Sequence, residues 1–255
     1  MASAIAKLSA APASVTPCGS VKDERLSCAS MDLGQIEAKL RSSDVQERIR
    51  AMTALRAYAP AVAVPLLRGC SQDPEFVVRS LAAMTLGHKR TPESFALLQG
   101  LLHDDADANV RAESANAIAA FGETALPDLM RSFREDQHWL VRLSILAALQ
   151  ALNQPQILFD SAVLAIADTD LSVREAAIDL LATFAGSPMQ TFALDKLLPL
   201  ARSEHWQLRA HLARALHCFD QHQARETLQV LRQDDNHHVV AAVLEGSVRP
   251  SPSLG

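Results

Sequence analysis

The chain has 255 residues, of which 49% are hydrophobic, enough for a packed core, and this excludes a disordered polypeptide. Its net charge is −5, and no run of Lys or Arg is long enough to neutralise a phosphate backbone, which argues against a nucleic-acid partner. Apolar runs such as APAVAVPLL, residues 59–67, are shorter than the ~20 residues that a membrane span needs.

Alanine and leucine supply most of the apolar content, whereas aromatic residues make up 4% of the chain and glycine is sparse. Alanine and leucine favour helices, and β-structures use more aromatic and β-branched residues. We therefore expect an all-α protein.

Four cysteines are scattered through the chain without a C-x-x-C pair, at Cys18, Cys28, Cys70 and Cys218. This pattern is typical of free thiols in a reducing compartment rather than of a disulfide framework or a zinc site. We therefore expect a cytoplasmic protein.

The first thirty residues are rich in Ala and Ser and lack the continuous apolar segment of a secretory signal. We interpret residues 1–30 as a disordered leader or an N-terminal extension that precedes a second start at Met31. The repeat region is expected to fill residues 31–248, and residues 249–255 are expected to form a disordered tail.

An arginine recurs at intervals of 31, 32, 31, 32 and 35 residues. The series, called the arginine ladder below, is Arg48, Arg79, Arg111, Arg142, Arg174 and Arg209. Self-similarity at such a period indicates structural repeats stacked along one axis. A seventh unit follows 31 residues later with Val240 in the arginine position, and we interpret it as a terminal cap.

Around each arginine the sequence predicts a helix with one buried stripe. Positions three, four and seven after the arginine are mostly apolar, as at Ala82, Ala83 and Leu86. The residue four before the arginine is expected to start the helix, because it is often a capping type. These residues are Asp44, Glu75, Asp107, His138, Asp170, His205 and Asn236.

A further apolar segment precedes each of these helices, for example FALLQGLLH at 95–103 and SAVLAIA at 161–167. Each unit is therefore predicted to be a pair of antiparallel helices. One pair cannot bury its apolar face alone, but stacked pairs share a continuous core. The expected fold is an α-solenoid of about seven helix pairs.

The template D-x-x-V-R-x-x-A-x-x-A-L resembles the HEAT-like repeats of the phycobilisome lyase type. DLSVREAAIDLL at 170–181 and DPEFVVRSLAAMTLG at 73–87 carry the resemblance most clearly, and it covers roughly residues 44–248. The order of AVAVPLL, HWLVRLSILAAL and HWQLRAHLARAL along the chain is most similar to the cyanobacterial phycobilisome degradation proteins.

This resemblance implies a cytoplasmic, phycobilisome-associated factor that binds phycobiliprotein subunits during phycobilisome turnover and detaches their bilin chromophores. Phycobilin would then be a ligand or substrate, and the residues indicate no other cofactor. Bilin lyase subunits, which attach or isomerise phycobilin, are similar and imply a second function with lyase-type activity. A third alternative is a non-catalytic scaffold in another system, such as iron-sulfur assembly, in which Cys70 or Cys218 would matter.

The ladder arginines are expected to pair with neighbouring aspartates or backbone carbonyls and so to tie one repeat to the next. Exposed pairs of this kind contribute only ~0–1 kcal/mol each, whereas truncating a core leucine costs ~2–5 kcal/mol. The ladder is therefore expected to set the geometry of the solenoid more than its stability.

A His-Trp pair occurs at the same position in two units, two repeats apart, so both pairs lie on one edge of the solenoid. With helices packed ~8–10 Å apart, the two tryptophans lie ~20 Å from each other, too far to hold one small ligand. Either each Trp packs over a turn and each His is an irregular cap, or the edge is an aromatic ridge for a protein partner. The candidates are Phe76, His138, Trp139, His205 and Trp206.

The inner surface of the solenoid is expected to come from positions two and five after each ladder arginine. These positions vary from repeat to repeat, which suits either a recognition surface or an ordinary solvated face. They include Glu113, Asn116, Ser144, Asp179, His211 and Arg214. For any bilin chemistry, the candidate acid or base groups are Asp179, Glu113 and His211.

The sequence lacks the common metal-binding and catalytic motifs. Deoxyhypusine hydroxylases are also built from HEAT-like repeats and bind iron through His-Glu pairs, but this chain has no His-Glu dipeptide. His211 and His217 are six residues apart, not the four that place two ligands on one helical face. No nucleophile elbow, P-loop or dinucleotide-binding glycine motif is present. The sequence therefore predicts no metal site and leaves any catalytic residues unknown.

Overall fold

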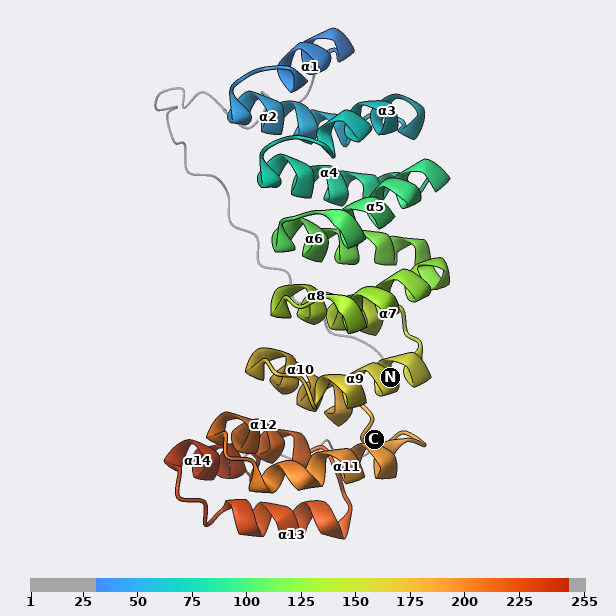
Figure 1. Cartoon of the computed structure of the whole chain (residues 1–255). Helices are drawn as coiled ribbons and strands as arrows, with labels where there is room; N and C mark the ends of the chain where they lie inside the picture. The colour runs from blue at the N-terminus through green and yellow to red at the C-terminus, as the bar shows by residue number, and fades with distance from the viewer. Residues whose placement is uncertain (1–30, 248–255) are drawn as a thin grey trace, which may run out of the picture.

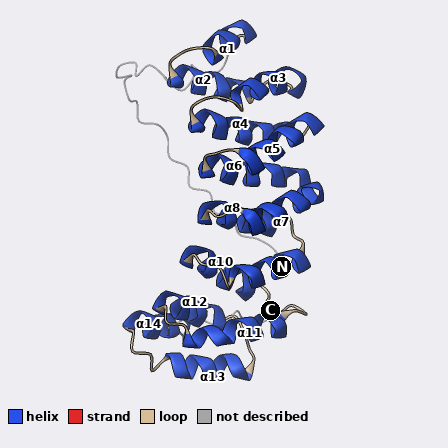
Figure 2. Cartoon of the chain, viewed as in Figure 1, coloured by secondary structure: helices blue, strands red, loops and turns tan. Residues whose placement is uncertain are grey.

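Helices account for all the regular structure in residues 31–247, the part of the chain that the computed structural model describes (Figure 2). The helices α1 to α14 stack into one elongated solenoid (Figure 1). The all-α fold predicted from composition and periodicity is confirmed. The expected leader at 1–30 and tail at 249–255 lie outside the described residues.

Residues 31–247 form seven helix pairs, as the arginine spacing predicts. The first helices are α1 (Leu33–Leu40), α3 (Pro60–Cys70), α5 (Pro92–Asp104), α7 (Leu126–Glu135), α9 (Pro155–Ala165), α11 (Gln190–Leu197) and α13 (His222–Leu231). The second helices are α2 (Val45–Leu55), α4 (Phe76–Lys89), α6 (Ala108–Ile118), α8 (Trp139–Ala151), α10 (Leu171–Ala182), α12 (Trp206–Leu216) and α14 (His237–Ser247). The 3₁₀ segments η2 (Ala119–Ala125) and η3 (Leu198–Arg202) precede α7 and follow α11.

The second helices begin where the capping residues predict. Asp44, Asp107 and Asp170 each accept a backbone N–H of the first turn at 2.8 or 2.9 Å. His138 also caps its helix, because its Nδ1 accepts a backbone N–H at 3.2 Å. His205 makes no such hydrogen bond, so the interpretation of both histidines as irregular caps holds for only one of them.

The second helices form one layer of the solenoid and the first helices form the other (Figure 1). Consecutive second helices contact each other along the whole stack. Between α4 and α6 the approach is so close that a Cβ atom on Gly87 would lie 2.9 Å from the carbonyl oxygen of Ala117. The stack bends around this closely packed layer, which therefore forms the inner side of the curve (Figure 1).

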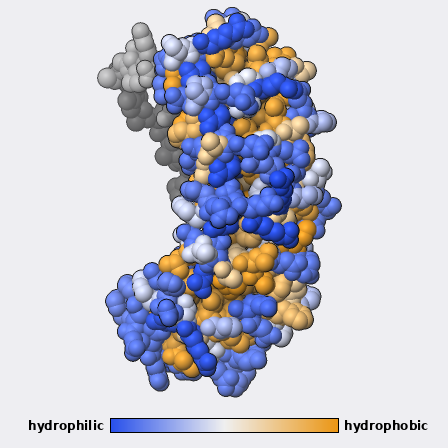
Figure 3. All heavy atoms as spheres, in the orientation of Figure 1, coloured by the Kyte–Doolittle hydropathy of each residue, from blue (hydrophilic) through white to orange (hydrophobic). Residues whose placement is uncertain are grey.

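The apolar stripe of each second helix lies in a core shared by neighbouring repeats. Ala82, Ala83 and Leu86 of α4 are all fully buried, and one continuous set of buried residues runs from α1 to α14. Apolar atoms also reach the surface over α9 and α11 (Figure 3), where Leu164 and Phe192 are exposed. Within residues 31–247, no helix has both the length and the apolar character needed to span a bilayer.

Candidate functional site

Five of the six ladder arginines bind an aspartate of the next repeat with a two-pronged ion pair. In the Arg79–Asp105 pair, Nε and Nη2 donate to the two carboxylate oxygens at 2.7 and 2.9 Å. Nη1 of Arg79 donates to the backbone carbonyl of Asp73 in its own turn, at 2.8 Å. The five pairs are Arg48–Asp73, Arg79–Asp105, Arg111–Asp136, Arg142–Asp168 and Arg209–Asp234.

Three of these aspartates, Asp73, Asp105 and Asp136, contact the arginines of two successive repeats. Oδ1 of Asp105 accepts the backbone N–H of Asp107 and so holds its own turn, at 2.9 Å. The backbone carbonyl of Asp105 accepts from Nη1 of Arg111, also at 2.9 Å. Asp105 therefore contacts the arginines of two successive repeats, Arg79 through its carboxylate and Arg111 through its backbone.

The ladder pairs are mostly buried, contrary to the expectation of exposed pairs worth little in stability. The side chains of Arg79 and Asp105 are only 15% and 5% exposed. Solvent screens such a pair less than a surface pair, and removing one partner leaves the other charge poorly solvated. Removing one partner of a ladder pair is therefore expected to destabilise the protein more than removing one partner of a surface pair.

The surroundings of the ladder aspartates favour their ionised form. Burial alone would raise the pKa of the Asp105 carboxyl, but hydrogen bonds from Arg79 and a backbone N–H more than offset burial and lower the pKa below its usual value. The same balance lowers the pKa of Asp136 and Asp168. At Asp234, the hydrogen bond from the ladder arginine is the largest influence and lowers the pKa.

Arg174 is the exception in the ladder. Its Nε donates to the backbone carbonyl of Ile166 at 3.1 Å, and the position two residues before the cap of α12 holds Ser203 instead of aspartate. Ser203 Oγ accepts the N–H of His205 at 3.3 Å, which preserves the turn. The ladder is thus interrupted between α10 and α12, where the arginine spacing is 35 residues.

The predicted aromatic ridge lies on the edge where the second helices begin. Phe76, Trp139 and Trp206 are the first residues of α4, α8 and α12, and they are 41%, 41% and 36% exposed. All three rings therefore keep a large part of their surface in solvent rather than packing fully over a turn.

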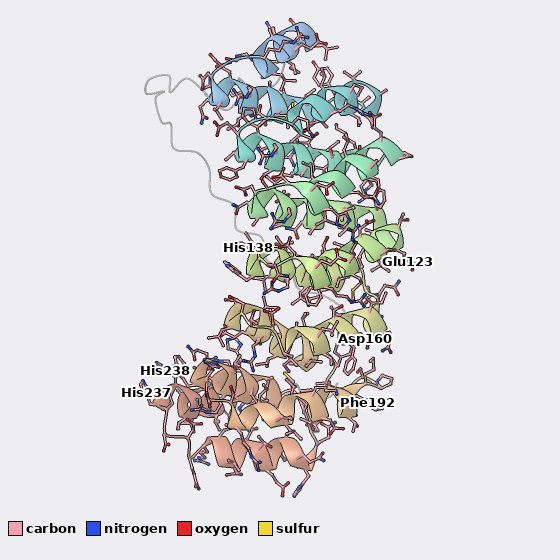
Figure 4. All side chains as sticks on the ribbon, in the orientation of Figure 1. Glu123, His138, Asp160, Phe192, His237 and His238 are labelled. Atoms are coloured by element: carbon pink, nitrogen blue, oxygen red, sulfur yellow. The ribbon has the colours of Figure 1, made fainter. Side chains whose placement is uncertain are left out.

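Each tryptophan stacks on a histidine of this edge. The ring centroids of His138 and Trp139 are 5.9 Å apart, with the planes at 26°. Trp206 stacks on His238 of the next repeat, with ring centroids 4.7 Å apart and ring planes at 22°. The ring centroids of His237 and His238 are 4.0 Å apart. Figure 4 shows His138, His237 and His238 on the same edge of the solenoid.

Sequence reasoning missed His237 and His238 as members of this edge. It grouped Trp206 with its chain neighbour His205, whereas the ring that stacks on Trp206 comes from α14. A signal was present, because His237 occupies the first position of α14, as Trp206 does in α12. Alignment of the last two repeats would have placed the His-His pair on the ridge.

The inner-face candidates form a group only at the C-terminal end of the solenoid. Nδ1 of His211 lies 3.3 Å from Oδ1 of Asp179, and its Nε2 lies 3.8 Å from Oε2 of Glu175. Arg214 pairs with Glu245 of α14 at 3.1 Å. Sequence reasoning missed Glu175 because it lies one residue after Arg174, outside the positions chosen for the inner face. It missed Glu245, five residues after Val240, because the positions were counted only from ladder arginines and the seventh unit has none.

The other inner-face candidates stand apart from this group. Glu113 and Asn116 lie on α6 and Ser144 lies on α8, whereas the group around His211 joins α10 to α12. The hydrogen bond to Asp179 is the largest influence on His211 and raises the pKa of its imidazole. Burial raises the pKa of the Glu113 carboxyl. Of the three candidate acid or base groups, Asp179 and His211 therefore lie together, and Glu113 lies apart from them on α6.

The two described cysteines differ in accessibility. Cys70 is buried, and burial raises the pKa of its thiol to about 11, so it stays protonated at neutral pH and is a poor metal ligand. Cys218 is exposed, and Cys18 and Cys28 lie outside the described residues. Over residues 31–247, no three His, Cys, Asp or Glu side chains are grouped so as to hold a metal ion.

The repeats match a known family in the N-terminal part of the solenoid. Residues 35–119 and 70–150 match the family model of HEAT repeats. The helix pairs that follow continue the same fold to α14. A search with the sequence finds no match among curated proteins.

Two solved structures are similar to this solenoid. Escherichia coli YibA superposes with a TM-score of 0.56 at 14% sequence identity, over 87% of this chain and 94% of YibA. Human deoxyhypusine hydroxylase in complex with glycerol gives a TM-score of 0.43 at 17% identity, over 84% of this chain and 94% of the hydroxylase. At this level of identity, the likeness to YibA shows the fold alone.

Proposed function

We propose that the protein is a binding scaffold for another protein and that Phe76, Trp139 and Trp206 contact the partner. The observation that carries this proposal is the exposure of 36–41% of three large aromatic residues on one edge, in a chain with only 4% aromatic residues. Tryptophan is favoured in interface hot spots, where the partner removes its ring from water.

The spacing of the ridge supports a macromolecular partner. The first residues of α4, α8 and α12 are two repeats apart, which corresponds to ~20 Å between neighbouring aromatic residues at ordinary helix packing distances. One small ligand cannot span such a distance. A folded protein surface can contact two or three of these positions at once.

The proposed partner is a phycobiliprotein, bound during phycobilisome turnover, as for the cyanobacterial phycobilisome degradation protein NblB. Its support is the resemblance of the repeat template and of the order of the two His-Trp segments. In this proposal the inner-face residues Glu113, Asn116, Ser144 and Arg214 add contacts to the partner. His211, held between two carboxylates, is the group suited to moving a proton near the bilin.

Binding of holo-phycocyanin to the purified protein tests the partner and the surface together. Trp139→Ala and Trp206→Ala should each lower the affinity by about tenfold or more, which corresponds to ~1.4 kcal/mol. Phe192→Ala is the matched control, because Phe192 is an aromatic residue that is 63% exposed but lies on the opposite side of the solenoid (Figure 4). Absence of binding by the wild-type protein would overturn phycobiliprotein as the partner.

Pigment chemistry is tested by mixing the protein with holo-phycocyanin, and separately with apo-phycocyanin and free bilin. Denaturing gels scored for zinc-enhanced bilin fluorescence report covalent pigment. Loss of pigment from the holo-protein is expected for bilin detachment and turnover. Gain of pigment on the apo-protein would instead identify a lyase subunit, and binding without either change would identify a non-catalytic scaffold.

A further inference from the structure

The interruption of the ladder leaves one arginine without a carboxylate. Within residues 31–247, Arg174 makes one side-chain hydrogen bond, from Nε to the carbonyl of Ile166, and it is in no ion pair. Arginine is always charged at physiological pH, and its planar fork matches the geometry of a carboxylate. Arg174 is half-buried, so its charge is only partly solvated.

The other five repeats show what this position binds. Arg142, one repeat before, donates from Nε and Nη2 to the two carboxylate oxygens of Asp168 at 2.7 and 2.8 Å. Arg209, one repeat after, makes the same pair with Asp234 at 2.7 and 2.9 Å. A carboxylate is therefore the ligand that this position takes on both sides of Arg174.

The absence of the aspartate does not alter the turn that would carry it. Ser203 occupies the aspartate position, and its Oγ accepts the N–H of His205 as the aspartates accept the corresponding N–H. The side chain of serine is shorter and carries no charge. Arg202, the exposed residue just before Ser203, adds a positive charge to this turn, and Glu204, the exposed residue just after it, adds a negative charge.

We propose that Arg174 binds a carboxylate supplied by another molecule in place of the missing aspartate. The carboxylate belongs either to a glutamate or aspartate side chain of a bound protein or to a free carboxylic acid. The site does not depend on the proposed phycobiliprotein partner or on the aromatic ridge. It requires only that a carboxylate reach the turn between η3 and α12.

The site can be tested by following the arginine Nε–Hε signals of the ¹⁵N-labelled protein during addition of sodium glutarate, with chloride replaced to keep ionic strength constant. The Arg174 signal is the one lost in Arg174→Gln. We expect this signal to shift and saturate while the signals of the paired ladder arginines stay in place. Arg134→Gln, which removes an exposed charge on α7, is the matched control and should leave the shift unchanged.

Ser203→Asp supplies the carboxylate from within the chain, so the Arg174 signal of this variant should resemble a paired ladder arginine and lose its response to glutarate. A second titration uses a peptide with a central glutamate flanked by leucines, and its glutamine counterpart. Tighter binding of the glutamate peptide than of glutarate identifies a protein carboxylate as the ligand, and equal affinity identifies a free acid. No shift with either probe, or an equal shift in Ser203→Asp, would overturn the proposal.

Discussion

Asp179 on α10 and His211 on α12 lie 3.3 Å apart, from Oδ1 to Nδ1, and join two consecutive repeats across the inner layer. Glu175, one turn before Asp179, approaches the other ring nitrogen. The imidazolium form of His211 is thus placed between two carboxylates from one neighbouring helix. This contact bridges the same two repeats between which the arginine ladder is interrupted.

The first prediction concerns the pH dependence of stability. The pKa of His211 is raised in the folded protein, chiefly by the hydrogen bond with Asp179. Protonated His211 therefore stabilises the folded protein. This contribution to the free energy of unfolding is fully present below the unfolded pKa of about 6.5 and is lost as the pH rises through the folded pKa. The free energy of unfolding should therefore fall more between pH 6 and pH 9 for the wild-type protein than for His211→Gln.

Urea denaturation at both pH values measures this difference. His222→Gln is the control, because the His222 side chain is 82% exposed and its ion pair is screened by solvent. Equal pH dependence in the wild-type protein and His211→Gln would contradict the prediction.

The second prediction concerns the strength of the ladder. The side chains of Arg111 and Asp136 are 17% and 8% exposed, so Arg111→Gln leaves a poorly solvated carboxylate and should cost about 2–4 kcal/mol. Arg131→Gln removes an exposed pair with Glu135 within one helix and should change stability by only ~0–1 kcal/mol. Chemical denaturation measures both values, and similar effects of the two variants would show that the ladder is no stronger than a surface pair.

The third prediction concerns acid. The pKa values of Asp105, Asp136, Asp168 and Asp234 are lowered in the folded protein. Such groups add stability above the unfolded pKa of about 3.9 and lose it as the pH falls through the folded values. Asp105→Asn should therefore be less stable than the wild-type protein at pH 6, and this difference should shrink on acidification to pH 2–3. Denaturation followed by circular dichroism at each pH measures this difference in the free energy of unfolding. A difference that does not change with pH would show that it does not arise from the ionised carboxylate.

The fourth prediction compares two glycines inside helices. A Cβ on Gly87 would lie 2.9 Å from the Ala117 carbonyl oxygen, whereas a Cβ on Gly100 meets no atom within 4 Å. Gly87→Ala should therefore destabilise the protein by about 1–3 kcal/mol because α4 and α6 must move apart. Gly100→Ala should stabilise it by about 0.5–1 kcal/mol, since alanine favours the helix. Thermal unfolding should show a lower melting temperature for Gly87→Ala and a higher one for Gly100→Ala than for the wild-type protein. An unchanged melting temperature for Gly87→Ala would show that α4 and α6 can move apart at little cost.

Much of the fold could be predicted from the sequence because the signals are local and recur. The arginine period and capping residues such as Asp44 and Asp107 placed the second helices, and periodic apolar residues placed the core. The burial of the ladder was not predicted, because it depends on how closely successive turns pack. An exposed pair and a buried pair have the same sequence pattern.

The candidate site was predicted less well than the fold. The stacking of Trp206 on His238 and the approach of Glu175 to His211 both join different repeats. Their geometry follows from the rotation of one repeat relative to the next, which residue spacing within a repeat does not specify. The spacing of 35 residues indicates an irregular unit. It does not indicate that Arg174 lacks a carboxylate, because the aspartate partners of the other arginines are known only from the structure.

The doubly used aspartates also bear on how the solenoid unfolds. Asp73, Asp105 and Asp136 each contact two arginines. The first five repeats therefore form an uninterrupted electrostatic chain that ends at Asp168, whereas Arg209 and Asp234 form a separate link near the C-terminus. In a linear array, cooperativity between neighbours depends on the strength of each interface. Amide hydrogens of α12 to α14 should therefore exchange through local openings that leave α2 to α8 protected, and the boundary between the two cooperative units should coincide with Ser203.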